Sequence, residues 1–518
     1  MDASNLSMGR SLHSNHQFDY EEGNVDNDND GEVSDTTPLM DGNNKQSDST
    51  KNPTSAASFF NMVFSAAGLL SDGYQSGVLS FINLALGKIY GKEVFDDAVS
   101  SRLSYAMFVG CVVGQLGFGF FVDRIGRKAG LVATTGFVIV GAAMSALSNG
   151  STPQGLFWMM VISRGVLVGV GGEYPCSSVS AGESADEVSP GNRGKLFVLL
   201  TNFVIDLGYV ISSLIPLILL AIYSEDNLAP VWRLSLGLGV IPPLIVLYFR
   251  LQMTDTKQYK ANALKIKVPY WLIFRRYWRK LFAVSFTWFV YDFISYPNGV
   301  FSSVIINQVA GGQPMIITCA WNILLYSFYL PGCVSGAFLV DKIGRRQTLT
   351  LGLISLGVVG MVIGGTFEPL STNCFPLFVI LYGLFLALAE MGPGNTMGLL
   401  SMESFPSSVR GTGYGIAAAF GKVGATVGTI AFGPMREHLG LRAPFLVGSA
   451  IAIVTGVFSW FAFQDVGPDG LEEEDRAFKQ YLQDNGYDIS LMGIEEPLSA
   501  GNYGATPIKS SENDHGNP

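Results

Sequence analysis

The sequence D-R-I-G-R-K at residues 123–128 recurs as D-K-I-G-R-R at residues 341–346, 218 positions further along the chain. Each of these two charged loops lies between apolar stretches long enough to cross a bilayer. Membrane topology alone requires positive charge in a loop, but neither the aspartate, nor the glycine, nor the repeat. The repeated D-x-x-G-R-[KR] pattern therefore predicts a duplicated bundle of membrane helices with a charged cytoplasmic loop in each half.

The composition agrees with a membrane protein. The chain of 518 residues is 48% hydrophobic and 14% charged, with a mean hydropathy of +0.33. Soluble domains usually carry about 25% charged residues. The 61 glycines fit the same class, because glycine lets membrane helices pack closely.

The net charge of −10 is distributed unevenly. Residues 1–58 hold 11 acidic and 3 basic residues, and residues 464–518 hold 12 acidic and 3 basic residues, so the core between them is net positive. Polar, acidic tails with few large apolar residues cannot bury enough surface to fold. We therefore expect both tails to be disordered. Residues 1–58 also lack the apolar segment of a signal peptide, so the first membrane helix is expected to direct insertion.

Twelve apolar stretches approach the roughly 20 residues that a spanning helix needs. They cover residues 59–83, 103–122, 129–148, 157–178, 195–221, 233–251, 282–306, 318–340, 348–366, 375–400, 411–433 and 443–463. The longest interruption, residues 252–281, carries eight Lys or Arg residues. The sequence thus predicts an all-α membrane protein with six-helix bundles over 59–251 and 282–463, joined by a basic central loop over 252–281.

The charges of the loops predict the orientation. Loops 123–128, 252–281 and 341–346 are basic, whereas loops 149–156 and 307–317 carry no charge. Because Lys and Arg favour the cytoplasmic side, we expect the basic loops and both tails in the cytoplasm. Loop 434–442, with Arg436 and Arg442, argues against this orientation but is outweighed by the others.

The repeat extends beyond the two charged loops. Glu183 is followed by Arg193-Gly194, and Glu403 is followed by Arg410-Gly411, at offsets of 220 and 217 residues. An aspartate can accept hydrogen bonds at a helix N-terminus, and an arginine can bridge to a carboxylate on a neighbouring helix, as Arg127 to Glu183. We expect these residues to form a gating network that holds helix ends together in one state and breaks in another. The gating network comprises Asp123, Arg127, Glu183, Arg193, Asp341, Arg345, Glu403 and Arg410.

Ionisable residues inside membrane spans are costly and usually functional. Away from the span ends they are Asp72, Arg164, Glu173, Asp206, Asp292, Glu390 and Lys422. All four histidines lie outside the spans, so proton coupling would run through carboxylates, with Asp72, Glu173, Asp206 and Asp292 as candidates. The alternative is that each carboxylate is a structural partner for Arg164, Lys422 or a backbone group. Nothing around Asp206 and Glu390 distinguishes them in the sequence.

Lys422 is flanked by glycines in an otherwise apolar helix. A buried cation requires an anion, either a phosphate of the substrate or a carboxylate such as Asp72 or Asp292. Helical spacing places Trp288, Asp292 and Tyr296 on one face.

Two other spans are interrupted by Gly and Pro. Gly171-Gly172-Glu173-Tyr174-Pro175 loosens one helix and can direct Tyr174 into a cavity. Gly392-Pro393-Gly394-Asn395 is a similar break in the tenth span. Both breaks are candidates for a binding site at mid-membrane depth.

The charged loops and the two six-helix halves resemble the major facilitator superfamily over residues 59–463. The Gly172-Glu173-Tyr174-Pro175 and Gly421-Lys422-Val423-Gly424 segments, with Trp288, Asp292, Tyr296 and Asn395, resemble the phosphate:proton symporter family. That resemblance implies a substrate site made by Tyr174, Trp288, Asp292, Tyr296, Asn395 and Lys422, and a proton route through Asp72 and Glu173. The chain has Glu173 where inorganic phosphate members usually carry Asp, and Asn202 or Asp206 is nearest to their fifth-span Gln.

Other segments look like the fungal glycerophosphodiester permeases: Ser71-Asp72-Gly73-Tyr74, residues 183–187, Tyr291-Asp292-Phe293 and residues 481–487. This resemblance implies a proton-coupled importer of glycerophosphocholine or glycerophosphoinositol in the plasma membrane, working by alternating access. It implies no cofactor, metal or nucleic acid. For a choline-bearing substrate, Trp288 and Tyr74 are candidate aromatic contacts.

Two alternatives remain open, an inorganic phosphate:proton symporter and a transporter-like nutrient receptor. An enzyme is not expected, because the sequence shows no nucleophile–base pair and no metal-binding cluster.

Overall fold

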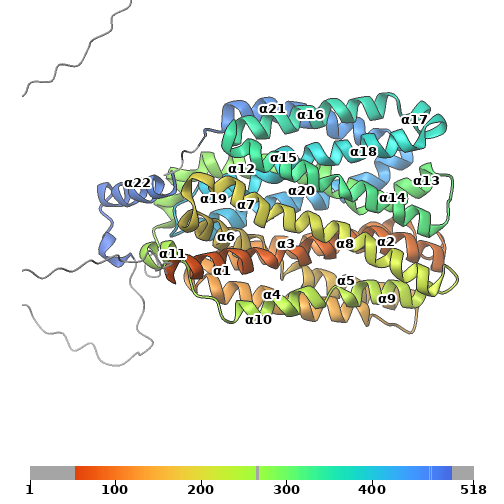
Figure 1. Ribbon diagram of the computed structural model, residues 1–518, viewed down its shortest axis with the longest axis horizontal. Coiled ribbons are helices and arrows are strands. Elements are labelled where there is room, and N and C mark those ends of the chain that lie inside the picture. The colour runs from red at the N-terminus through yellow and green to blue at the C-terminus, as the bar shows by residue number, and fades with distance from the viewer. Residues whose placement is uncertain (1–52, 264–267, 466, 468–469, 493–518) are drawn as a thin grey trace, which may run out of the picture. The chain divides into compact units, whose positions relative to one another are not determined.

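The computed structural model describes residues 53–263, 268–465, 467 and 470–492, and every regular element in these residues is a helix (Figure 1). The all-α membrane class is confirmed. Up to the central segment the helices are α1 (Pro53–Ala67), α2 (Leu69–Tyr90), α3 (Asp97–Arg124), α4 (Arg127–Ala146), α5 (Pro153–Ile162), a π-helical turn (Ser163–Gly169), α6 (Tyr174–Val188), α7 (Arg193–Leu200), α8 (Asn202–Tyr223), α9 (Leu228–Leu238), α10 (Ile241–Arg250) and α11 (Lys257–Asn262). The others are α12 (Tyr270–Val300), α13 (Ser302–Val309), α14 (Met315–Ser327), α15 (Tyr329–Lys342), α16 (Arg345–Gly365), α17 (Phe367–Asn373), α18 (Phe375–Ala389), a π-helical turn η3 (Glu390–Gly394), α19 (Asn395–Glu403), α20 (Arg410–Leu439), α21 (Ala443–Ala462) and α22 (Gly470–Asp484).

Ten helical segments of the described chain are long and apolar enough to cross a membrane. They match ten of the twelve predicted spans. The predicted spans 59–83 and 282–306 correspond to α1–α2 and to α12, which run alongside the other helices in Figure 1. Both are less apolar, since α2 buries Asp72 and Gln75 and α12 buries Trp288 and Asp292. These polar residues face other helices and not lipid.

The glycine of each charged loop has a conformational role. Gly126 and Gly344 have φ angles of 127° and 98°, a region that favours glycine. The following helix then begins at once, and its first turn is capped by a distant carboxylate. Asp255 accepts a hydrogen bond from the Lys128 N–H at 2.9 Å, and Asp465 accepts one from the Arg346 N–H at 3.0 Å. Both caps belong to the internal repeat, although the sequence patterns do not reveal them.

The first half and the second half of the chain approach closely where α3 crosses α20. A Cβ added to Gly415 would lie 2.4 Å from the Gln115 carbonyl oxygen, and one added to Gly119 would lie 2.7 Å from that of Gly411. Any larger side chain at these positions would push the two helices apart. Glycine therefore sets the distance between the two halves.

The predicted boundaries of the basic loop and of the second tail are wrong in part. Residues 257–262 and 270–281 of the predicted central loop are helical.

Within the tail that we expected to be disordered, Gly470–Asp484 forms α22. Helical spacing places Leu471, Phe478 and Leu482 on one buried face, and Phe478 and Leu482 pack with Tyr277 and Phe405. The many acidic residues of this segment led to the prediction of a disordered tail in spite of its apolar stripe. Residues 1–52 and 493–518 lie outside the described residues.

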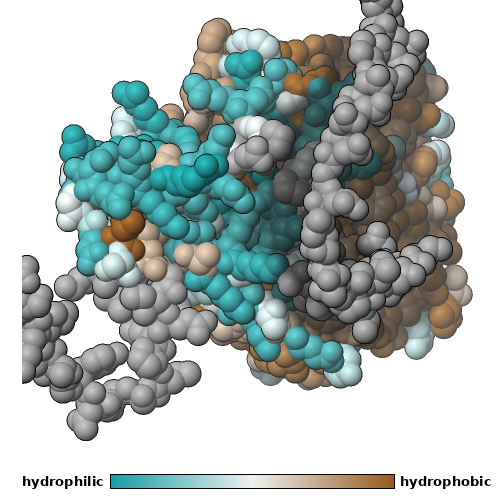
Figure 2. All heavy atoms as spheres, turned by 60° about the vertical axis from the view of Figure 1, so that its left-hand side comes forward, coloured by the Kyte–Doolittle hydropathy of each residue, from teal (hydrophilic) through white to brown (hydrophobic). Residues whose placement is uncertain are grey.

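Polar contacts also hold α22 in place. The Glu474 carboxylate accepts hydrogen bonds from the Tyr277 hydroxyl at 2.6 Å and the Lys280 ammonium at 2.8 Å. Burial raises the pKa of Glu474, but the contacts with Lys280, Tyr277 and Arg276 outweigh it, so the pKa lies below its usual value. Figure 2 shows hydrophilic side chains gathered at the end of the molecule that carries α11 and α22, next to an apolar flank.

The Asp475→Ala substitution is expected to release α22. Asp475 accepts hydrogen bonds from the Ser407 N–H and hydroxyl, both at 2.6 Å. Their loss should weaken docking by about 2 kcal/mol, or roughly 30-fold in the docking equilibrium. Tryptic cleavage after Arg476 should accelerate accordingly. The exposed Glu473→Ala variant serves as the control, and equal cleavage rates for the two variants would contradict the assignment.

Candidate functional site

Each charged loop is tied to a helix end of its own half. Arg127 donates to Asp123 at 2.8 Å and to Glu183 at 2.7 Å, so the predicted contact between Arg127 and Glu183 is present. In the second half Arg345 lies 3.2 Å from both Asp341 and Glu403. The internal repeat thus extends from sequence to side-chain contacts.

The same residues also join the two halves. Arg410 lies 3.0 Å from Glu183, and Arg193 lies 2.8 Å from Glu403, with all four side chains buried. Each glutamate therefore holds one arginine of its own half and one of the other half. Asp186, which lies 2.7 Å from Arg193, also belongs to this network but was not predicted from the sequence.

The two aspartates of the charged loops cap helices of the opposite half. Asp123 accepts from the N–H groups of Gly411 and Thr412 at 2.9 and 2.6 Å, at the start of α20. Asp341 accepts from the N–H of Lys195 at 2.7 Å, at the start of α7. A carboxylate at a helix N-terminus is favoured by the helix dipole. These contacts close the charged-loop end of the bundle.

Contacts between the halves at the opposite end are of a different kind. Ser80 of α2 donates to the Ser303 hydroxyl at 2.6 Å, and Asn322 of α14 donates to Ser213 of α8 at 2.8 Å. An exposed ion pair joins Arg436 to Asp97 at 2.5 Å. Neutral and exposed contacts contribute less than buried charged ones. The two ends are therefore held with unequal strength.

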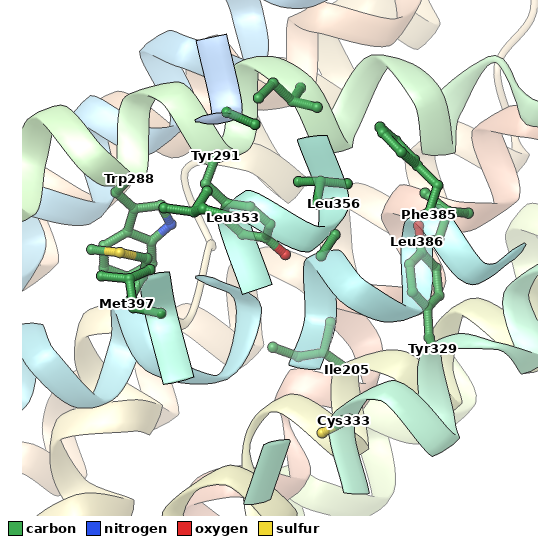
Figure 3. Packing of buried hydrophobic residues seen from close by; sticks show 14 of the residues in the cluster. Ile205, Trp288, Tyr291, Tyr329, Cys333, Leu353, Leu356, Phe385, Leu386 and Met397 are labelled. Atoms are coloured by element: carbon green, nitrogen blue, oxygen red, sulfur yellow. The ribbon is translucent and has the colours of Figure 1, made fainter. Parts of the chain in front are cut away.

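A polar cavity lies between the halves, midway along the bundle. Its walls come from α6, α7, α8, α12, α15, η3, α19 and α20, and its volume is about 50 Å³. Typical small-molecule sites occupy roughly 300–1,000 Å³, so an organic substrate requires the halves to separate. Figure 3 shows Trp288 beside Met397, with Tyr291 projecting from the same helix as Trp288.

Lys422 of α20 is buried and paired. Its ammonium lies 2.9 Å from the Asp292 carboxylate, donates to the Tyr296 hydroxyl, and lies 4.9 Å from the centre of the Tyr174 ring. Of the two carboxylates considered as partners of Lys422, Asp72 and Asp292, it is Asp292 that forms the ion pair. A Cβ added to Gly421 would lie 2.6 Å from the Trp288 ring, which accounts for the glycine beside Lys422.

Asp72, Glu173 and Arg250 form a second buried group next to this pair. Asp72 accepts a hydrogen bond from the Glu173 N–H at 3.2 Å, while the Glu173 carboxylate lies 2.8 Å from Arg250. The alternative considered from the sequence, a structural partnership with Arg164, Lys422 or a backbone group, did not include Arg250. Arg250 was not predicted as a partner because it lies at the end of a span, where a basic residue usually only marks the cytoplasmic side.

Arg164 and Tyr74 take positions that the sequence did not predict. Arg164 donates to the Gln75 carbonyl at 2.5 Å, and no carboxylate of the described residues forms a salt bridge with it. Tyr74 donates to the Ser235 carbonyl and does not line the cavity. Tyr74 is therefore not an aromatic contact for a substrate in this state.

Asn395 lies behind the cavity wall. Its side-chain N–H donates to the Cys333 carbonyl at 2.8 Å, and its oxygen accepts from Asn202 at 3.0 Å. Asn202 itself lines the cavity together with Asp206 and Glu390. The fifth-span and tenth-span residues that seemed undistinguished in the sequence therefore face the cavity.

Comparisons with known proteins identify the fold and the family. A model of the "Sugar (and other) transporter" family matches residues 60–267 and 265–478. The solved structure of the proton:xylose symporter XylE of the major facilitator superfamily superposes with a TM-score of 0.70 at 18% identity, over 82% of this chain and 99% of that one. This likeness shows the fold alone.

Together, the fold and the family match show that the protein is a secondary transporter of the major facilitator superfamily. The chain belongs to the sugar (and other) transporter family. It is 41% identical over 441 residues to the glycerophosphocholine permease GIT4 of Candida albicans, covering 83% of each chain. It is 36% identical over 438 residues to the glycerophosphoinositol transporter 1 of Saccharomyces cerevisiae, covering 84% of each chain. A probable inorganic phosphate transporter of Arabidopsis thaliana is 24% identical, over 80% of this chain and 92% of that one.

Proposed function

We propose that the protein is a proton-coupled importer of glycerophosphodiesters, such as glycerophosphocholine or glycerophosphoinositol, that works by alternating access. One observation carries the proposal most directly: the Lys422–Asp292 ion pair, buried between the halves beside aromatic hydroxyls. The 36–41% identity to glycerophosphodiester permeases supports the substrate class.

The phosphate group of the substrate takes the place of Asp292 at Lys422. The ammonium supplies the positive charge, and the hydroxyls of Tyr174 and Tyr296 donate hydrogen bonds, as does the Trp288 ring N–H. Asn202 provides the polar contact that the family resemblance implies for Asn395, because Asn202 lines the cavity.

Protonation of Asp292 couples the proton to the substrate. A neutral Asp292 no longer neutralises Lys422, so the cation becomes available to the anionic phosphate. Asp72 is a second proton acceptor near Lys422, since both line the same small cavity. Glu173 contributes through Asp72, because its own carboxylate is engaged by Arg250. Asp206 remains a further candidate.

Alternating access follows from the two unequal ends. The gating network closes the end that carries the charged loops, and the contacts of Ser80 and Asn322 close the other end. We propose that the charged-loop end faces the cytoplasm in the plasma membrane, with both tails on that side. The weaker end then opens outward first, and the gating network breaks when substrate and proton are released inward.

Uptake in cells that lack their own diester and phosphate transporters tests this function. Labelled glycerophosphocholine should enter faster at acidic external pH and be displaced by excess unlabelled glycerophosphoinositol, but not by inorganic phosphate at equal concentration. Displacement by phosphate, with uptake of labelled phosphate itself, would favour a phosphate symporter. Signalling without flux would favour a nutrient receptor. Uptake that is unchanged by alkalinisation would exclude proton coupling.

A further inference from the structure

Asp206 and Glu390 give the cavity an acidic side that phosphate binding does not use. Asp206 comes from α8 in the first half, and Glu390 from η3 in the second half. Both are buried and both line the cavity. An acidic pair repels a phosphate, so these residues need a different ligand group.

The acidic side and the cationic side of the site are separated by a thin wall. Lys422 and Asp72 line a smaller neighbouring cavity, whereas Asp206 and Glu390 line the larger one. Four residues line both cavities and form the wall: Tyr174, Ile205, Tyr209 and Tyr296. If these side chains move apart, the two cavities become one elongated site with Lys422 at one end and the acidic pair at the other.

The acidic side has unused hydrogen-bonding capacity. Oδ2 of Asp206 has no hydrogen-bond partner among the described residues, although the side chain is only 2% exposed. The Ser295 hydroxyl, also on the cavity wall, lacks a partner within the same part of the chain. A buried polar atom without a partner is costly, so a ligand that donates hydrogen bonds here is favoured.

Glu390 is held in place but retains acceptor capacity. Its two oxygens accept from the Tyr291 hydroxyl at 2.7 Å and from Asn202 at 2.9 Å. A carboxylate offers about four lone-pair positions, so each oxygen can accept one more hydrogen bond. The two contacts orient the carboxylate without saturating it.

We propose that Asp206 and Glu390 bind the two free hydroxyl groups of the glycerol part of the substrate, while the phosphate binds at Lys422. This inference rests on the proposed function and adds the residues that separate diesters from inorganic phosphate. Two hydroxyls donate to Asp206 and Glu390 and accept from Ser295. A quaternary ammonium group has no hydrogen to donate and would leave Asp206 without a partner.

Competition between two matched substrates tests the assignment. Propylphosphocholine keeps the phosphate and the choline of glycerophosphocholine but lacks both glycerol hydroxyls. A site built around substrate hydroxyls strongly rejects an analogue without them. The wild-type protein should therefore prefer glycerophosphocholine at least about tenfold in uptake competition. The Asp206→Leu and Glu390→Leu variants should reduce this preference to about twofold or less. Asp206→Asn, which keeps an acceptor, should give an intermediate preference and guards against misfolding of Asp206→Leu. Glu368→Gln, an exposed acidic position in α17, is the matched control.

Each outcome has a defined meaning. An unchanged preference in the Asp206 and Glu390 variants, or no preference in the wild type, overturns the inference while diester transport stands. Variants that lose glycerophosphocholine but keep glycerophosphoinositol would show that the acidic pair binds the choline cation instead. A wild type that carries only inorganic phosphate overturns the proposed function and this inference together.

Discussion

The Lys422→Ala variant is expected to lose diester uptake by at least about 100-fold. Lys422 is buried, and its ammonium is the partner of Asp292 at 2.9 Å. Without the ammonium the substrate phosphate loses its cationic contact, and the loss of one partner of a buried charge pair weakens binding by about 2–5 kcal/mol. Each 1.4 kcal/mol corresponds to a factor of ten. Initial rates of labelled glycerophosphocholine uptake, normalised to folded protein, measure this effect.

Two further variants separate binding from folding. The Lys422→Ala/Asp292→Ala double variant removes both charges, so it should recover folded protein relative to the single variant but not transport. Lys422→Arg keeps the charge in a larger, planar group that fits poorly between Asp292 and Tyr296, and we expect a loss of at least about tenfold. Uptake within threefold of wild type in Lys422→Ala would contradict the proposed phosphate site.

The second large effect is expected from Glu183→Gln. Glu183 accepts hydrogen bonds from Arg127 of its own half, from Thr256 of the central segment and from Arg410 of the other half. An amide cannot neutralise two buried guanidinium groups, so the charged-loop end should open more often. We expect at least a tenfold loss of uptake, because closure of this end limits each transport cycle.

Thiol labelling reports this opening directly. A cysteine at the buried Ser408, in a background with the exposed Cys374 replaced by serine, should react at least tenfold faster in Glu183→Gln than with Glu183 present. Glu225→Gln is the control, because Glu225 forms a partly exposed pair with Lys88 at the opposite end, and such pairs contribute about 0–1 kcal/mol. Equal labelling rates in all three proteins would exclude a gating role for Glu183.

Much of the fold was predictable because membrane spans and charged loops are local signals. The D-x-x-G-R-[KR] repeat predicted the contact of Arg127 with Glu183. It did not reveal Asp255 and Asp465, which cap the same loops, because these carboxylates lie in segments that follow the sixth and twelfth spans. Helix α22 was missed because its acidic residues outweigh the three apolar residues of its buried face.

The candidate site was predictable where its residues share one helix. Trp288, Asp292 and Tyr296 follow from helical spacing, and all three line the cavity. Residues brought together from different helices were harder to predict. Arg250 meets Glu173 from a distant span, and Asn202 lines the cavity where the family resemblance implied Asn395. Asp206 and Glu390 lie on different helices, and only the structure shows that both line the same cavity.

Proton movement in proteoliposomes tests the central claim most directly. The purified protein is reconstituted with a pH-sensitive dye in the lumen, and glycerophosphocholine is added outside. We predict that the lumen acidifies upon substrate addition in the wild type, and that Asp292→Asn and Lys422→Ala abolish the signal. Entry of labelled glycerophosphocholine without any acidification of the lumen would contradict proton-coupled transport through the Lys422–Asp292 pair.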